Sequence, residues 1–82
     1  MDLKYKKIRF KNPEHRVQVQ EWLFSQGCEW ITSGRKLVNY PDDFGLYVDY
    51  DGKITRISSE SVFKNNKCEE IEIPSELTYE IY

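Results

Sequence analysis

The sequence predicts an α+β domain in which a single helix packs on one face of a mainly antiparallel sheet, in the order β-α-β-β-β-β. Three observations lead to this fold class. A capped amphipathic stretch lies near the N-terminus, stretches of alternating apolar and polar residues lie on both sides of it, and turn residues separate the later stretches. A chain of 82 residues has room for one small core. We therefore expect one domain over residues 1–82, with its core within residues 4–73 and a short tail over residues 75–82.

The predicted helix covers about residues 13–26, and both of its ends carry recognisable signals. Asn12 is placed to accept an unpaired amide hydrogen as the N-cap, and Pro13 suits the first helical position because no amide donor is needed there. Glu14 adds negative charge at the positive end of the helix dipole. Gly27 can adopt the left-handed conformation that ends a helix.

Two sides of this helix carry apolar residues. The side expected to meet the sheet consists of Val19, Trp22 and Leu23, with Gln26 on the same face. Val17 and Phe24 form a narrower apolar line on the opposite side. Two interpretations of this line remain open: the chain's own loops or tail cover it, or it is exposed and binds a partner.

Strand-like stretches cover about residues 5–10, 29–32, 36–39, 46–50, 53–57 and 68–73. In the first of them Ile8 and Phe10 alternate with Tyr5, Lys7 and Arg9. Such alternation is typical of a strand with one buried and one solvated face.

The later stretches are predicted to form hairpins. Ser33-Gly34 indicates a turn or bulge between the second and third stretches. For the next two stretches, a three-residue turn with a left-handed Gly52 places Val48 opposite Ile54 and so gathers the apolar residues on one face. Tyr47 then points to the other face.

The last strand-like stretch is expected to lie beside the first. Its outward acids, Glu70 and Glu72, are opposite in charge to the outward Lys7 and Arg9, and each such cross-strand pair stabilises a sheet by roughly 0.2–1 kcal/mol. An irregular helical turn before this last strand is expected to place Phe63 at the edge of the core.

The composition predicts a folded, cytoplasmic protein. The hydrophobic content is 39% and the aromatic content 15%, which is more than disordered chains carry. No run approaches the roughly 20 apolar residues of a membrane helix, and the first residues lack the apolar stretch of a signal peptide. In this compartment we expect Cys28 and Cys68 to be reduced structural thiols, with a disulfide as the alternative.

The charges are unevenly distributed, although the formal net charge is only −2. Residues 1–16 carry six basic and two acidic residues, a net charge of +4, whereas residues 69–82 carry five acidic residues and no basic one, a net charge of −5. The overall charge therefore favours neither nucleic acid nor a membrane as a partner, but the N-terminal part is locally basic.

The sequence predicts no catalytic, cofactor-binding or metal-binding residues. His15 is the one histidine, and in the first turn of the helix it is expected to be solvated or to help cap the helix. Turn chemistry accounts for the clustered aspartates, whose spacing lacks the oxygen-ligand series of a calcium loop. The four glycines are scattered rather than grouped before a helix as in a phosphate-binding loop. We therefore expect a protein that is not an enzyme.

Several segments follow one another in a recognisable order: a strand, Pro13-Glu14-His15, a helix with Leu23-Phe24, then Gly27, Trp30, Leu46-Tyr47-Val48, Asp51-Gly52-Lys53-Ile54-Thr55 and Cys68-Glu69-Glu70-Ile71. This order resembles small uncharacterised accessory proteins of tailed bacteriophages, whose helix ends in Leu-Phe, Gly and Trp before an antiparallel sheet. Cys28 and Cys68 depart from that pattern, which has an aromatic residue and a tyrosine there. The resemblance implies a phage protein in the host cytoplasm that acts on a host or defence protein, and it implies no catalytic signature.

Protein binding is the main functional hypothesis: a non-enzymatic protein that forms a stoichiometric complex with a host or defence protein, as an inhibitor, or with a second copy of itself as a homodimer. A lone helix leaves one sheet face uncovered, and tyrosines on such a face are typical interface anchors. The candidate partner-binding residues are Tyr5, Lys7, Arg9, Val17, Phe24 and Tyr47.

The first alternative is a single-stranded nucleic-acid-binding module. Its phosphate and base contacts would come from the basic, aromatic N-terminal strand, with Lys4, Lys6, Lys7, Arg9 and Lys11 beside Tyr5 and Phe10. The acids of the last strand would neutralise much of this charge, which makes nucleic acid the less favoured partner.

The second alternative is an oligomer that sequesters a nucleotide. Arg35 or Lys36 would meet the phosphate. A stacking pocket at a subunit interface would be formed by Trp22, Trp30, Tyr40, Phe44, Tyr47 and Tyr50.

Overall fold

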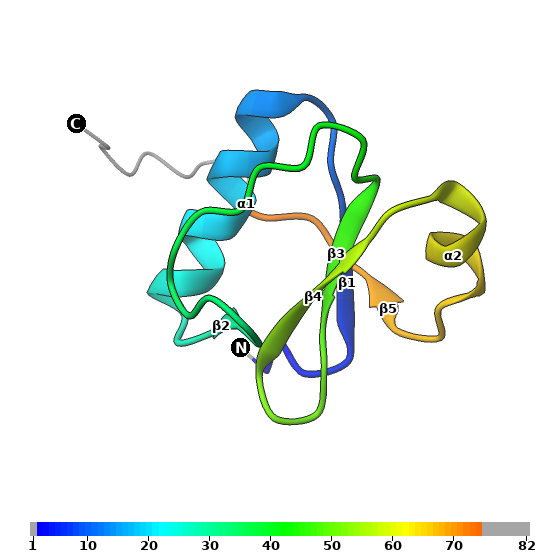
Figure 1. Ribbon diagram of the computed structural model, residues 1–82. Coiled ribbons are helices and arrows are strands. Elements are labelled where there is room, and N and C mark those ends of the chain that lie inside the picture. The colour runs from blue at the N-terminus through cyan, green and yellow to red at the C-terminus, as the bar shows by residue number, and fades with distance from the viewer. Residues whose placement is uncertain (1, 75–82) are drawn as a thin grey trace.

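The computed structural model describes residues 2–74, which form one five-stranded sheet with a helix on each side (Figure 1). Along the chain the elements are β1 (Lys6–Arg9), α1 (Pro13–Ser25), β2 (Glu29–Trp30), β3 (Gly45–Val48), β4 (Lys53–Ile57), α2 (Glu60–Asn65) and β5 (Glu69–Glu70). The predicted C-terminal tail and its contacts lie outside the described residues.

The strands lie in the order β2-β4-β3-β1-β5 across the sheet. The central pairs β1/β3 and β3/β4 are antiparallel, whereas the outer pairs β2/β4 and β1/β5 are parallel. The predicted α+β class is therefore confirmed. The predicted single helix and mainly antiparallel order are wrong in detail, because the sheet is mixed and α2 intervenes before the last strand.

Helix α1 begins and ends where its sequence signals placed it. The side chain of Asn12 accepts a hydrogen bond from the backbone N–H of His15 at 2.7 Å, which caps the first turn. After Ser25 the chain passes through Gln26 to Gly27, whose φ of +93° is the left-handed conformation expected of a C-terminal glycine.

The buried face of α1 differs from the predicted one in its polar residues: Arg16 and Gln20 are buried and Gln26 is not. Val19, Trp22 and Leu23 are buried as predicted, but Gln26 is exposed because it forms the C-cap. Gln20 takes the buried place instead, with 1% of its surface exposed. A polar side chain buried to this degree must be hydrogen-bonded, and its partners are described below.

The core lies between α1 and one face of the sheet. The sheet side contributes Ile8, Trp30, Leu46, Val48 and Ile54, all at most 5% exposed. Leu3 is also buried, so the core begins just before the predicted range of residues 4–73. The β3–β4 register is the predicted one: Val48 pairs with Ile54, and Gly52 has a φ of +82° in the connecting turn.

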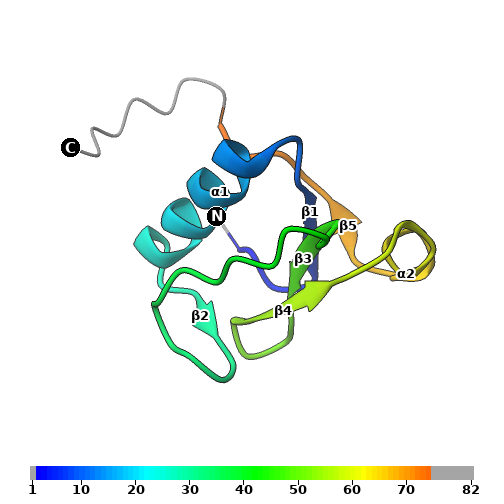
Figure 2. The same cartoon turned by 45° about the horizontal axis from the view of Figure 1, so that its top comes forward.

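A second helix lies on the other face of the sheet, so the prediction that this face is uncovered is wrong. Helix α2 lies against it (Figure 2), and its Phe63 is 1% exposed, as is Ile57 of β4. Lys7 was expected in solvent but is only 7% exposed: its Nζ donates hydrogen bonds to the carbonyls of Phe63 and Asn66 and lies 4.5 Å from the centre of the Phe63 ring. Carbonyls at the end of a helix lack intrahelical partners, so the buried ammonium group is satisfied there.

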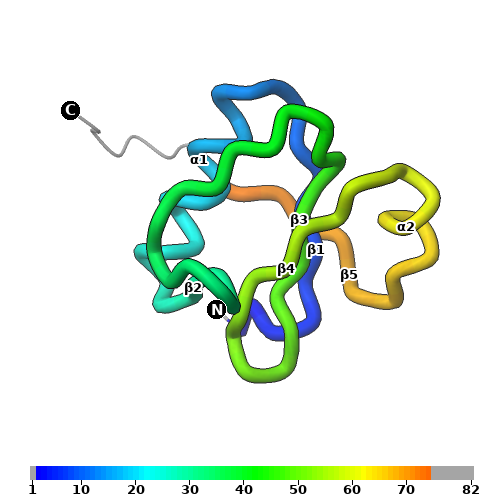
Figure 3. Tube along the Cα trace, viewed as in Figure 1, coloured from blue at the N-terminus to red at the C-terminus, as the bar shows by residue number. Residues whose placement is uncertain are grey.

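The predicted hairpin over residues 29–32 and 36–39 is wrong. Strand β2 ends at Trp30 and pairs in parallel with β4, and the chain then turns back so that Trp30 pairs with Gly34. The following segment runs alongside α1 before it joins β3 (Figure 3). The Gln20 side chain of α1 is hydrogen-bonded to the backbone N–H and C=O of Val38 in this segment. These bonds hold the segment beside the helix rather than in the sheet.

Candidate functional site

The six predicted partner-binding residues do not form one surface. Lys7 and Tyr47 are paired across β1 and β3, and Lys7 is buried under α2. The guanidinium of Arg9 lies 4.7 Å from the ring centre of Phe44 and 4.9 Å from that of Phe63, on the same side. Around Lys7 and Arg9 this face is therefore packed under α2, whereas Tyr47 is half-buried on it.

The remaining predicted residues lie elsewhere. Tyr5 precedes β1 with a φ of +62° and is 60% exposed. Val17 of α1 is 38% exposed, whereas Phe24 is half-buried against the core. Of the Val17 and Phe24 line, only Val17 is thus exposed in the described part of the chain.

The basic strand β1 is largely neutralised by the acidic strand beside it. Lys6 and Glu69 form an ion pair at 2.6 Å, and Arg9 and Glu70 lie at 3.5 Å. Lys11 continues this row with Glu72 at 3.4 Å. The prediction that β1 and β5 are neighbours is confirmed, and the hydrogen bond to Glu69 raises the pKa of Lys6. Three of the five cations proposed for phosphate binding thus already face carboxylates, and Lys7 binds backbone carbonyls.

Three of the exposed apolar side chains lie in one segment, between β2 and β3. Ile31, Leu37 and Tyr40 are 61%, 50% and 47% exposed. Monomers rarely expose such side chains together without a use for them. The sequence signal was present, since apolar residues recur between Ile31 and Tyr40, but it was interpreted as two short strands, and of these three residues only Tyr40 was assigned a function, in the nucleotide alternative.

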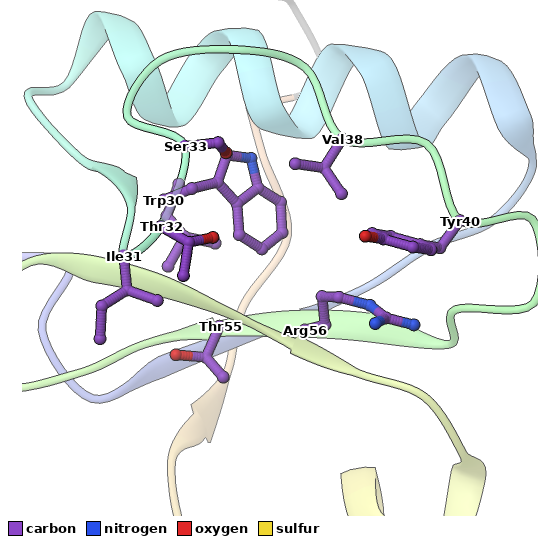
Figure 4. Close-up of a pocket in the computed structure, with 9 residues that line it drawn as sticks. Trp30, Ile31, Thr32, Ser33, Val38, Tyr40, Thr55 and Arg56 are labelled. Carbon is purple, nitrogen blue, oxygen red and sulfur yellow. The ribbon is translucent and has the colours of Figure 1, made fainter.

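Ile31 and Tyr40 line a hollow of about 360 Å³, which we call the edge groove (Figure 4). It is bounded by residues 30–33, Val38 and Tyr40 on one side and by residues 54–56 of β4 on the other. Figure 4 shows Trp30 and Val38 at its back, below α1, with Tyr40 and Arg56 at one end and Ile31 and Thr32 at the other.

The floor of the edge groove is a strand edge that β2 covers only in part. Strand β2 pairs with β4 at Lys53 and Ile54, and the last contact is a weak hydrogen bond of 3.4 Å from Ile31 N–H to the Ile54 carbonyl. The carbonyls of Lys53 and Ile57 accept hydrogen bonds from the β3 side of β4. Because successive residues of a strand direct their backbone groups to opposite edges, the N–H and C=O of Arg56 point to the outer edge of β4. Within residues 2–74 no strand pairs with this edge beyond Ile54.

One end of the edge groove is held by an ion pair and an aromatic stack. Arg56 binds both carboxylate oxygens of Asp43 at 2.7–3.1 Å, and its guanidinium lies 3.7 Å from the Tyr40 ring centre. The hydrogen bond to Asp43 is the main reason why the pKa of Arg56 is raised. A planar guanidinium that binds a carboxylate and stacks on a ring fixes both partners, so Tyr40 is held as a wall of the groove.

The back of the edge groove is held by Gln20. Its Oε1 accepts hydrogen bonds from Trp30 Nε1 at 3.0 Å and from Val38 N–H at 2.7 Å, and its Nε2 donates to the Val38 carbonyl at 3.0 Å. One side chain of α1 thus binds both the indole of β2 and the segment that follows it. Sequence reasoning missed Gln20, because a glutamine beside a hydrophobic stripe gives no local sign of burial.

At the other end, Glu29 and Lys53 join β2 to β4 with an ion pair at 2.8 Å. The hydrogen bond from Lys53 lowers the pKa of the Glu29 carboxyl below 4.5. In Lys53→Met we therefore expect this pKa to rise towards its ordinary value, which a carbon-detected NMR titration of Glu29 measures. Because the folded-state pKa is depressed, the pair stabilises the fold above the unfolded pKa and is lost as pH falls through the folded pKa. An unchanged Glu29 titration in the variant would contradict the pairing.

Other groups that often carry chemistry occupy structural positions. His15 accepts a hydrogen bond from the Lys11 backbone, and partial burial lowers its pKa. Cys28 and Cys68 are free thiols whose pKa values are raised by burial, which disfavours the reactive thiolate. Among residues 2–74, no group of three or more histidine, cysteine or acidic side chains is arranged to hold a metal ion.

Neither helix in the described part of the chain has the length and apolar character needed to cross a membrane. Comparison of the sequence and structure with family models, curated proteins and solved structures gave no match.

Proposed function

We propose that this chain is a non-enzymatic phage accessory protein that acts in the bacterial cytoplasm by binding a host or defence protein. The edge groove is the contact surface in this proposal, in place of the sheet face that α2 covers. The observation that carries it is a hollow beside an unpaired strand edge that is lined by two exposed apolar side chains, Ile31 and Tyr40, with exposed Leu37 in the same segment.

A protein fits this surface better than the two alternatives do. Nucleic acid would have to compete with Glu69, Glu70 and Glu72 for the cations of β1 and its neighbourhood. Of the six rings expected around a nucleotide, Trp30 and Tyr40 line the edge groove. Two rings and an open apolar hollow suit a protein side chain at least as well as a base, and protein interfaces are enriched in such aromatic residues.

The test is capture of a partner from bacterial lysate by tagged protein, with Ile31→Glu compared against the unmodified chain. A carboxylate at this exposed rim position should leave the fold intact but place a charge against an apolar contact. We expect recovery of the captured protein to fall about tenfold or more, the effect of losing an interface anchor.

Val62→Glu is the matched control. Val62 is 51% exposed on α2, on the other side of the sheet, so the same change in charge and polarity should leave capture unchanged. If Ile31→Glu and Val62→Glu captured the same amount as the unmodified chain, the edge groove would not be the contact surface.

A further inference from the structure

The unpaired edge of β4 has a geometry that an additional strand would complete. β2 occupies this edge as far as Ile54 and then leaves it, so a strand beyond the end of β2 would meet the free N–H and C=O of Arg56. Its side chains on the α1 side of the sheet would enter the edge groove between Trp30 and Tyr40 (Figure 4). Strand addition of this kind derives affinity from the backbone and selectivity from pockets for alternate side chains.

The chain itself contains a segment with the required pattern. After the described residues the sequence continues Ser75-Glu76-Leu77-Thr78-Tyr79-Glu80-Ile81-Tyr82. Leu77, Tyr79 and Ile81 alternate with Thr78 and Glu80, which is the period of a strand with one apolar face. We propose that residues 77–81 of one copy pair with the β4 edge of a second copy, with the apolar side chains in its edge groove.

Chain length favours a second copy over the same copy. The described chain leaves β5 at one edge of the sheet, whereas the edge groove lies at the opposite edge, beside β4. After β5 the described chain ends beside α1, and α1 lies between that end and the segment that borders the edge groove (Figure 2). From Pro74 to Leu77 the chain takes three Cα–Cα steps, at most about 11 Å, which is no more than the diameter of a helix with its side chains. In a reciprocal exchange the segment of each copy docks on the other copy, so the reach of the segment within its own chain does not limit docking.

The charges are complementary as well. Arg35 and Lys36 are exposed in the segment that borders the edge groove, and no ion pair within residues 2–74 involves them. The incoming segment carries Glu76 and Glu80 and no basic residue. Opposite charges on the two surfaces favour their encounter and make it weaker at high salt.

The experiment is sedimentation of the full chain over a range of concentrations. The docked segment is short, so we expect a dimer with a dissociation constant on the order of 10–100 µM. Tyr79→Asp and Ile31→Glu should each weaken this dimer at least tenfold, whereas Thr78→Asp and Val62→Glu should not. In the dimer, exchange of the Arg56 amide hydrogen should slow as concentration rises. Unaltered circular dichroism of each variant shows that the fold is retained.

Mixing the two disrupted variants gives the decisive result. Tyr79→Asp keeps an intact groove and Ile31→Glu keeps an intact segment, so the mixture should form a heterodimer through one intact contact, with a lower dissociation constant than the homodimer of either variant. A chain that stays monomeric throughout the range, or a dimer that tolerates Tyr79→Asp, would overturn the proposal. Arg56 protection that does not depend on concentration would also overturn it, since the segment would then dock within its own chain.

This inference goes beyond the proposed function and can fail independently of it. Capture of a host protein is measured at concentrations far below the dimer dissociation constant, where Tyr79→Asp should capture as much as the unmodified chain. A monomeric protein whose capture still depends on Ile31 would reject the dimer alone, whereas a dimer that captures no protein would reject the proposed function alone.

Discussion

Gln20→Leu is expected to lower the free energy of unfolding by about 3–5 kcal/mol, which is comparable to the whole stability of a domain of this size. The substitution removes the acceptor of both Trp30 Nε1–H and Val38 N–H, which bond to Gln20 Oε1 at 3.0 and 2.7 Å. Each buried donor left without a partner costs about 1–3 kcal/mol, and the Val38 carbonyl loses its donor as well. Urea unfolding followed by tryptophan fluorescence measures the change.

Gln18→Leu is the matched control, because Gln18 lies on the same helix and is exposed. The same chemical change there should alter stability by no more than about 0.5 kcal/mol. A cost of less than about 1 kcal/mol for Gln20→Leu would mean that the segment around Val38 finds other partners and that Gln20 does not hold the back of the edge groove.

The elements that sequence analysis located correctly are those with local signals. The Asn12 cap, Pro13 and Gly27 fix the two ends of α1 because each acts through its own backbone or a neighbour within three residues. The β3–β4 register was predictable for a related reason: a shift of one residue would move Val48 and Ile54 out of the core.

The elements that it missed depend on contacts between distant residues. A lysine in an alternating strand is ordinarily solvated, and only α2, some 56 residues further along the chain, supplies the carbonyl that keeps Lys7 buried. The predicted helical turn that buries Phe63 is confirmed as α2, but six residues are too few to show which face of the sheet the helix covers. Its position on the second face follows from contacts of the Phe63 ring with Lys7 and Arg9.

Apart from Trp30 and Tyr40, which the nucleotide alternative placed around a pocket, the candidate site was missed for the same reason. Ile31 and Tyr40 are ordinary apolar residues of a connecting segment until Gln20 holds that segment against α1 and β2 ends early. The predicted sites assumed that an uncovered sheet face was the available surface. Once α2 covers that face, the unpaired edge of β4 is the place where backbone groups and apolar side chains are available together.

Gly45→Ala is expected to destabilise the fold by about 3–4 kcal/mol, through steric conflict rather than lost contacts. A Cβ at this position would collide with the backbone carbonyl of Ile8 and would lie 2.9 Å from Cε2 of the Phe63 ring. Gly45 pairs with Arg9 of β1 and with Ile57 of β4, so neither neighbouring strand can move away without loss of sheet pairing. Thermal unfolding should show the loss directly.

Gly27→Ala and a double variant separate this conflict from the general effect of replacing glycine. Nothing lies within 4 Å of a Cβ at Gly27, and its φ of +93° limits the cost there to about 1–2 kcal/mol. Adding Phe63→Ala to Gly45→Ala removes the ring conflict but not the one with the Ile8 carbonyl, so the double variant should be less stable than Phe63→Ala alone. If the double variant were instead as stable as Phe63→Ala, the Phe63 ring alone would be the reason why Gly45 cannot carry a side chain. If Gly45→Ala cost no more than Gly27→Ala, neither the Ile8 carbonyl nor the Phe63 ring would approach Gly45 as closely as the structure shows.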